Sequence, residues 1–129
     1  MDVAEAAYDK LVTNLHVDDR GFLMNFAFVE SDYGTKIFDY YDNVAQIWPL
    51  RKELFQKTKL TTLSKKHSQI LSEFGIDWIM LQYHELNVPL FSCLAMDLYL
   101  DYINAYPMPY GDEEQSKIYE EITVTVYFS

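Results

Sequence analysis

The sequence is poor in cysteine and glycine, and each shortage excludes a class of site. A single cysteine among 129 residues rules out an internal disulfide and a cluster of thiolate metal ligands. Four glycines leave no phosphate-binding loop of the P-loop or Rossmann kind, and no GxSxG nucleophile motif occurs. We therefore expect neither a bound nucleotide nor another cofactor.

Long apolar runs are also missing. The longest, Val88–Met96, falls far short of the ~20 residues that a transmembrane helix needs, and Asp97 follows it directly. The opening residues, MDVAEAAYDK, lack the basic and apolar regions of a secretory signal. The sequence thus predicts a cytoplasmic protein that does not interact with membranes.

Basic residues are scarce and unevenly placed. Ten lysines and arginines stand against 20 acidic residues, which gives a net charge of −10, and six of the ten lie in residues 51–66, the basic band. An acidic surface repels nucleic acid and attracts basic proteins, so we expect no direct nucleic-acid binding. Solubility alone explains the charge equally well.

The most informative stretch that is present runs from Val88 to Tyr106. Pro89 suits the first turn of a helix, and Pro107 forbids continuation beyond Tyr106. Because a helix that is apolar nearly all round is normally buried, the sequence predicts a central buried helix near residues 89–105. Its few polar residues lie along one edge, which we expect to face water or a partner: Asp97, Asp101 and Asn104.

Three further helices are indicated. Apolar residues recur at helical spacing over residues 2–15. Pro49 suits the start of a short helix that reaches about Lys57. Residues 64–74 form a helical pattern that ends at Gly75, which we expect to be a left-handed cap.

Four other segments favour β-strands. Residues 22–29 and 35–42 flank a turn and predict a hairpin, residues 77–84 indicate a buried strand, and residues 118–128 alternate with a period of two. Helix is the competing interpretation of such short apolar runs. We predict one α+β domain over residues 1–129, with a mostly antiparallel sheet of three or four strands packed against about four helices.

Catalytic and metal-binding patterns are weak. His84 and Glu85 begin an HExxH zinc motif, but Val88 stands where its second histidine belongs. Cys93 lies on the most buried helix, where apolar surroundings make a thiol inert. We therefore expect no metal and no enzyme activity, and only an alternative hypothesis, a small hydrolase, uses Asp97 and Asp101 with His84.

Tyrosine is abundant, with eleven copies, and several tyrosines stand beside acidic residues. Tyrosine is enriched at protein interfaces because it buries a large area and keeps a hydrogen-bonding tip. Tyrosines also pack against the face of a β-sheet. The interface interpretation and this structural interpretation have equal weight. The candidate residues for contact with a partner are Asp97, Tyr99, Asp101, Tyr102, Asn104, Tyr106, Tyr110, Asp112, Glu113 and Glu114.

These observations favour a small acidic binding protein without enzyme activity. It would block a basic partner, such as a nuclease or a nucleic-acid-binding enzyme, by occupying the surface that holds phosphates, as an immunity protein or a phage-encoded inhibitor does. In this sense its surface mimics nucleic acid. The alternative is a structural or adaptor subunit that self-associates through apolar surface, for example as a homodimer.

Overall fold

The computed structural model describes residues 2–15, 20–31, 33, 41, 43–106, 109 and 111–128. These residues form α-helices and short 3-10 turns and contain no β-strand, so the prediction of an α+β fold is wrong. The helices are α1 (Asp2–Leu15), α2 (Arg20–Ser31), α3 (Lys52–Lys57), α4 (Ser64–Phe74), α5 (Pro89–Tyr102) and α6 (Asp112–Phe128). The turns are η2 (Thr61–Leu63), η3 (Trp78–Met80) and η4 (Tyr83–Asn87).

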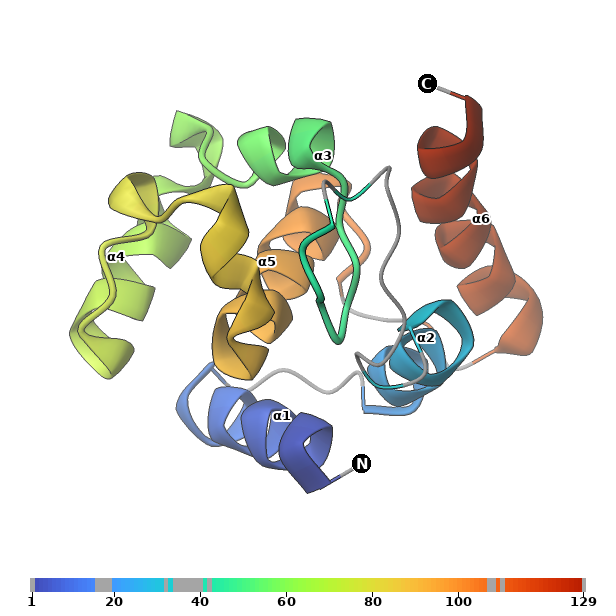
Figure 1. Cartoon of the computed structure of the whole chain (residues 1–129), viewed down its shortest axis with the longest axis horizontal. Helices are drawn as coiled ribbons and strands as arrows, with labels where there is room; N and C mark the ends of the chain where they lie inside the picture. The colour runs from blue at the N-terminus through green and yellow to red at the C-terminus, as the bar shows by residue number, and fades with distance from the viewer. Residues whose placement is uncertain are drawn as a thin grey trace.

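Helix α5 occupies the centre of the molecule, as predicted from its composition. It packs against α1, α3 and η4, and the other helices surround it (Figure 1). Every residue from Ser92 to Leu100 is buried. Pro89 stands in the first turn as predicted, and Val88 is the N-cap residue.

The central helix ends at Tyr102, three residues before the predicted end near residue 105. Asn104 adopts a left-handed conformation with φ of 60°, and the backbone N–H of Ala105 donates to Leu100 O at 2.8 Å. The N–H of Asn104 donates to Asp101 O at 3.0 Å, which completes a Schellman C-cap. Asn104, a candidate contact residue, therefore has a structural role in turning the chain.

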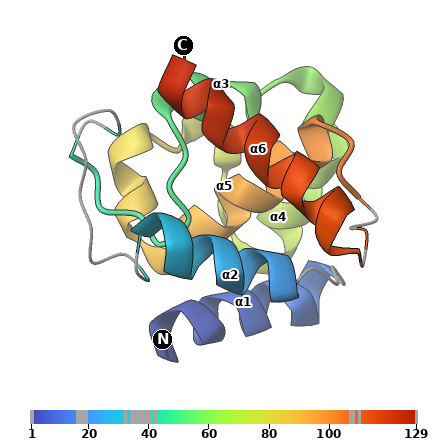
Figure 2. The same cartoon turned by 90° about the vertical axis from the view of Figure 1, so that its right-hand side faces the viewer.

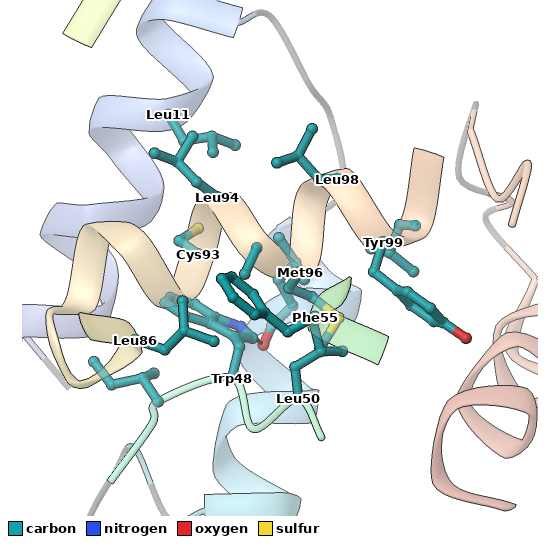
Figure 3. Close-up of a cluster of buried hydrophobic side chains, with 14 of the residues drawn as sticks. Leu11, Trp48, Leu50, Phe55, Leu86, Cys93, Leu94, Met96, Leu98 and Tyr99 are labelled. Carbon is teal, nitrogen blue, oxygen red and sulfur yellow. Dashed lines mark hydrogen bonds between the residues drawn. The ribbon is translucent and has the colours of Figure 1, made fainter. Parts of the chain in front are cut away.

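The chain from residue 46 to residue 51 has no regular structure and is buried beside α5. Its polar groups are satisfied by distant residues: the Trp48 backbone N–H donates to Ser92 Oγ at 2.9 Å, and the Trp48 indole N–H donates to Leu23 O at 2.7 Å. Figure 3 shows Trp48 and Leu50 packed with Phe55 in the apolar cluster next to α5. The core thus joins α2, this segment and α5.

The first predicted strand, residues 22–29, lies within helix α2. Its buried residues Phe22, Leu23, Phe26 and Ala27 have the i, i+1, i+4, i+5 spacing of one helical face, while Phe28 is 55% exposed. Apolar residues occupy nearly every position of this run. Its sequence therefore cannot distinguish the period of a strand from that of a helix. Residues 34–40 and 42, most of the second predicted strand, lie outside the described residues.

The last predicted strand, residues 118–128, belongs to helix α6. Three acidic residues in its first turn favour a helix N-terminus, and packing of Ile122, which is fully buried, outweighs the β-propensity of the threonines and valines. Residues 77–84 form turns η3 and η4 instead of a strand. Burial is as expected for Trp78 and Tyr83, which both pack on Phe55, but Ile79 and Met80 are 50% and 72% exposed.

Helices α1 and α4 match their predicted ranges, and Gly75 caps α4 with φ of 68°. Helix α3 begins at Lys52, three residues after Pro49. In the part of the chain that the structure describes, no helix has the length and apolar character required to cross a membrane.

Candidate functional site

The structure separates the candidate contact residues into two groups. Those on α5 lie mainly inward: Asp97 and Tyr99 are buried, while Asp101 and Tyr102 are half-buried, as is Tyr106 in the chain after α5. Those at the start of α6, Asp112, Glu113 and Glu114, are exposed, as is Asn104. Tyr110 lies outside the described residues. Among the described candidates, the acids of α6 and Asn104 are thus exposed, whereas the others are buried or half-buried.

Asp97 is a buried ion-pair partner rather than a surface residue. Its Oδ2 lies 2.7 Å from Lys66 Nζ on α4, and its side chain is 0% exposed against 17% for Lys66. The Lys66 ammonium also lies 5.5 Å from the centre of the Tyr106 ring, whose hydroxyl hydrogen-bonds to the Asp97 carboxylate. Within the described residues Oδ1 has no hydrogen-bond partner. The prediction that this edge faces water fails at Asp97.

Burial raises the pKa of Asp97 above its usual range, since a charged carboxylate is poorly solvated there. The charge of Lys66 and the hydrogen bonds from Lys66 and Tyr106 oppose this effect, and Asp101 adds a small contribution in the direction of burial. Asp97 thus links α5 to α4 and to the chain after α5. It does not offer a carboxylate to a ligand at the surface.

A cavity of about 550 Å³ lies between α2 and α6, and we call it the α2–α6 groove. Figures 1 and 2 both show α2 between α1 and α6. The outer face of α2 and the first half of α6 form its walls. The lining residues are Phe22, Asn25, Val29, Asp112, Gln115, Ser116, Tyr119 and Glu120.

Helix spacing explains why these side chains meet. On α2 the lining residues Phe22, Asn25 and Val29 are three and four positions apart, which places them on one face. On α6 the lining residues recur over Asp112, 115–116 and 119–120 in the same manner. Phe22 belongs to the buried side of α2 and lines the edge of the groove, whereas Asn25 and Val29 are exposed.

Tyr119 fixes α6 against α2. Its ring lies 5.3 Å from that of Phe26, and its hydroxyl donates a hydrogen bond to Glu30 Oε1. At the start of the helix, Gln115 Nε2 donates to Pro109 O at 2.6 Å. These contacts, with the buried Ile122, hold both walls of the groove in place.

The groove combines apolar and acidic side chains. Its charged lining residues, Asp112 and Glu120, are both acidic and both exposed, and Glu30 carries a third carboxylate beside Tyr119. Val29 is 50% exposed and contributes open apolar surface. Two carboxylates above an apolar surface suit a ligand that carries both positive charge and apolar groups.

Half of the charges of the basic band make contacts within the molecule. Arg51 pairs with Glu53 at 2.6 Å, and Lys66 pairs with Asp97. The Lys59 ammonium donates to Ile79 O at 2.9 Å and also to Leu81 O. Three of the six positive charges in the band are therefore used within the molecule.

Metal and nucleophile chemistry find no support in the described residues. Across the described ranges, no three His, Cys, Asp or Glu side chains gather in a way that could hold a metal ion. Cys93 is fully buried, as predicted. His84 is exposed on η4, whereas Asp97 is buried, and neither Asp97 nor Asp101 lines a groove with it.

Comparisons with protein-family models, with curated proteins and with solved structures found no match to this chain. The groove itself thus carries the functional argument. The sequence-based reasoning identified Asp112 but missed the α2 wall, together with Tyr119 and Glu120. Helical spacing could have identified these residues. If residues 22–29 and 118–128 are treated as helices, the spacing shows which of their side chains share a face.

Proposed function

We propose that this chain is a binding protein without enzyme activity that captures a basic segment of a partner protein in the α2–α6 groove. The observation that carries the proposal is the lining of the groove, where both charged side chains are acidic and stand beside the apolar residues Phe22 and Val29. Exposed carboxylates steer a basic partner to this face, and burial of apolar surface retains it.

The occupant that best fits this lining is an amphipathic helix with lysine or arginine beside its apolar face. A groove between two helices accepts a third helix through apolar side chains spaced three and four positions apart. Basic residues next to that apolar face would meet Asp112 and Glu120. A nucleic acid is disfavoured because its phosphates would approach these carboxylates.

The more specific form of the proposal concerns the partner. Proteins that hold phosphates, such as nucleases, carry basic surfaces that an acidic protein can cover, so the chain would act as an inhibitor or immunity protein. A cytoplasmic location, as the sequence predicts, belongs to this proposal. The hydrolase alternative is not favoured, because the Asp97 carboxylate is buried and paired with Lys66.

A synthetic amphipathic helix of leucine and lysine tests the groove directly, with the same peptide carrying glutamate for lysine as its control. We expect the lysine peptide to bind, and its affinity to fall as salt rises. Titration of a dye-labelled peptide, followed by anisotropy, measures both effects.

Two matched double variants locate the binding. D112N/E120Q removes two carboxylates that line the groove, and E113Q/E114Q removes two exposed carboxylates of the same helix that do not line it. The first should weaken binding about three- to tenfold and the second less than about twofold. Equal losses, or equal binding of the glutamate peptide, would contradict the proposal. A salt-independent homodimer that ignores the lysine peptide would favour the self-association hypothesis instead.

A further inference from the structure

A second cavity, of about 440 Å³, lies between α3 and the chain around η4, and we call it the α3–η4 pocket. It shares no lining residue with the α2–α6 groove. Its volume lies in the ordinary range for small-molecule sites. The lining residues are Val44, Lys52, Phe55, Gln56, Lys59, Leu81, Gln82, Tyr83 and His84.

The floor of this pocket is apolar and rigid. Phe55 is 1% exposed and Leu81 6% exposed, and Figure 3 shows Phe55 within the central apolar cluster. The Phe55 ring packs against Trp78 and Tyr83, with centroid distances of 6.0 Å and 5.6 Å. The Tyr83 hydroxyl is anchored by donation to Leu50 O at 2.7 Å. The floor is thus part of the core and needs no ligand to form.

Lys59 supplies a fixed positive charge at the wall. Its ammonium donates to Ile79 O and Leu81 O and lies 5.0 Å from the centre of the Phe55 ring. Two of its three donors are used by these carbonyls, which leaves one for a ligand. Burial lowers the pKa of Lys59, and the charges of Glu85 and Asp77 oppose that shift. Neither acid lines the pocket.

The titratable groups of the wall are all basic or neutral. Lys52, in the first turn of α3, is exposed and joins Lys59, while His84 lies on η4. Gln56 and Gln82 add amide groups. Among the residues that the structure describes, no carboxylate lines the pocket, although acidic residues outnumber basic ones by two to one in the chain. The pocket therefore departs from the overall charge of the protein.

We propose that the α3–η4 pocket binds a small organic anion, a carboxylate or phosphate ester that carries a compact apolar group. The anionic group would lie between the ammonium groups of Lys52 and Lys59. The apolar group would cover the floor formed by Val44, Phe55 and Leu81. This inference is independent of the function proposed for the α2–α6 groove.

The test uses phenyl phosphate, benzoate and inorganic phosphate as probes of the intact chain. Each is titrated while the amide resonances of residues 52–59 and 81–84 are followed by NMR. We expect saturable shifts with phenyl phosphate or benzoate. Inorganic phosphate should bind several-fold more weakly, because it gains no contact with the floor. Absence of saturation with both aromatic anions, or equal affinity for inorganic phosphate, would overturn the proposal.

Two lysines on one helix provide the matched variants. Lys52 lines the pocket, whereas Lys57 is exposed on α3 and does not line it, so K52Q and K57Q remove the same charge from the same helix. K52Q should weaken binding of the aromatic anion about fivefold, and K57Q less than about twofold. Neither change touches the buried core. Equal effects of the two variants would show non-specific attraction and would also overturn the proposal.

Discussion

Helix α5 and helix α6 both carry acidic residues, but the two helices use them differently. Asp97 of α5 is fully buried and paired with Lys66, whereas Asp112 and Glu120 of α6 are exposed at the α2–α6 groove. The difference follows from the rest of each helix. Because α5 is apolar on nearly every side, its acid enters the core with the helix and requires a cation there. An acidic residue on a helix that is otherwise apolar therefore favours a buried ion pair over a surface that binds a partner.

The largest effect expected from this comparison is the loss of Asp97. D97A leaves the ammonium of Lys66, only 17% exposed, without its partner, and we expect it to lower the free energy of unfolding by about 3–5 kcal/mol. Chemical denaturation measures this change. D101A, one turn further along α5 at a half-buried carboxylate, is the control and should cost less than about 1 kcal/mol. A similar loss of stability in both variants would contradict the distinction between the buried Asp97 and the half-buried Asp101.

A second expectation concerns the pH dependence of stability. Burial raises the folded pKa of Asp97 above the ordinary value of an aspartate, so the folded state takes up the proton more readily than the unfolded state. Protonation of Asp97 therefore adds stability that is fully present below the unfolded pKa and is lost as the pH rises through the folded pKa, whereas the ion pair with Lys66 acts above the folded pKa. Wild type should gain stability relative to D97N as the pH falls through that window. A constant difference between the two would contradict the raised pKa.

The attachment of α6 gives a smaller effect. Y119F keeps the ring contact with Phe26 but removes the hydroxyl that donates to Glu30. Loss of a hydrogen bond to a charged group should lower the free energy of unfolding by about 1.5–3 kcal/mol if Glu30 stays dry, and by less where water replaces the hydroxyl. Denaturation of Y119F beside E30Q measures the cost. A double variant as stable as either single one would confirm that the two side chains act together.

The smallest effect is expected at the exposed acids. D112N removes one charge from the first turn of α6 and should cost about 0.3–1 kcal/mol through its interaction with the helix dipole. Thermal denaturation at low and high salt measures this contribution, which salt should diminish. A cost as large as that of D97A would show that Asp112 is structural and would place it with Asp97 rather than with the groove.

The sequence was sufficient for the helices whose pattern is unambiguous and insufficient elsewhere. The period of the apolar residues predicts α1, Gly75 marks the end of α4, and Pro89 marks the start of α5. Residues 22–29 are apolar on both faces, so a period of two and a helical period fit equally well. That choice depends on packing against Trp48, whose indole donates to Leu23 O. No local pattern reveals such a contact.

The candidate site shows the same limit. Asp97, Asp101 and Asn104 form one edge in the sequence, but the partner of Asp97 is Lys66, 31 residues away, and Asn104 serves the C-cap of α5. The pairing of α2 with α6 is equally remote, since Tyr119 and Glu30 are 89 residues apart. Only the acidic start of α6 was visible from local sequence. Whether these acidic residues of α6 can bind a partner depends on α2, which forms the other wall of the groove.

The burial of both tryptophans has an optical consequence. Trp48 is 0% exposed and Trp78 is 1% exposed, and these are the two tryptophans of the chain. Their emission reports the integrity of the interior, since loss of the core would transfer both indoles to water and shift the spectrum to longer wavelength. Trp48 reaches α2 and α5, while Trp78 packs on α3. Intrinsic tryptophan fluorescence therefore follows the folding of the centre of the molecule through one signal.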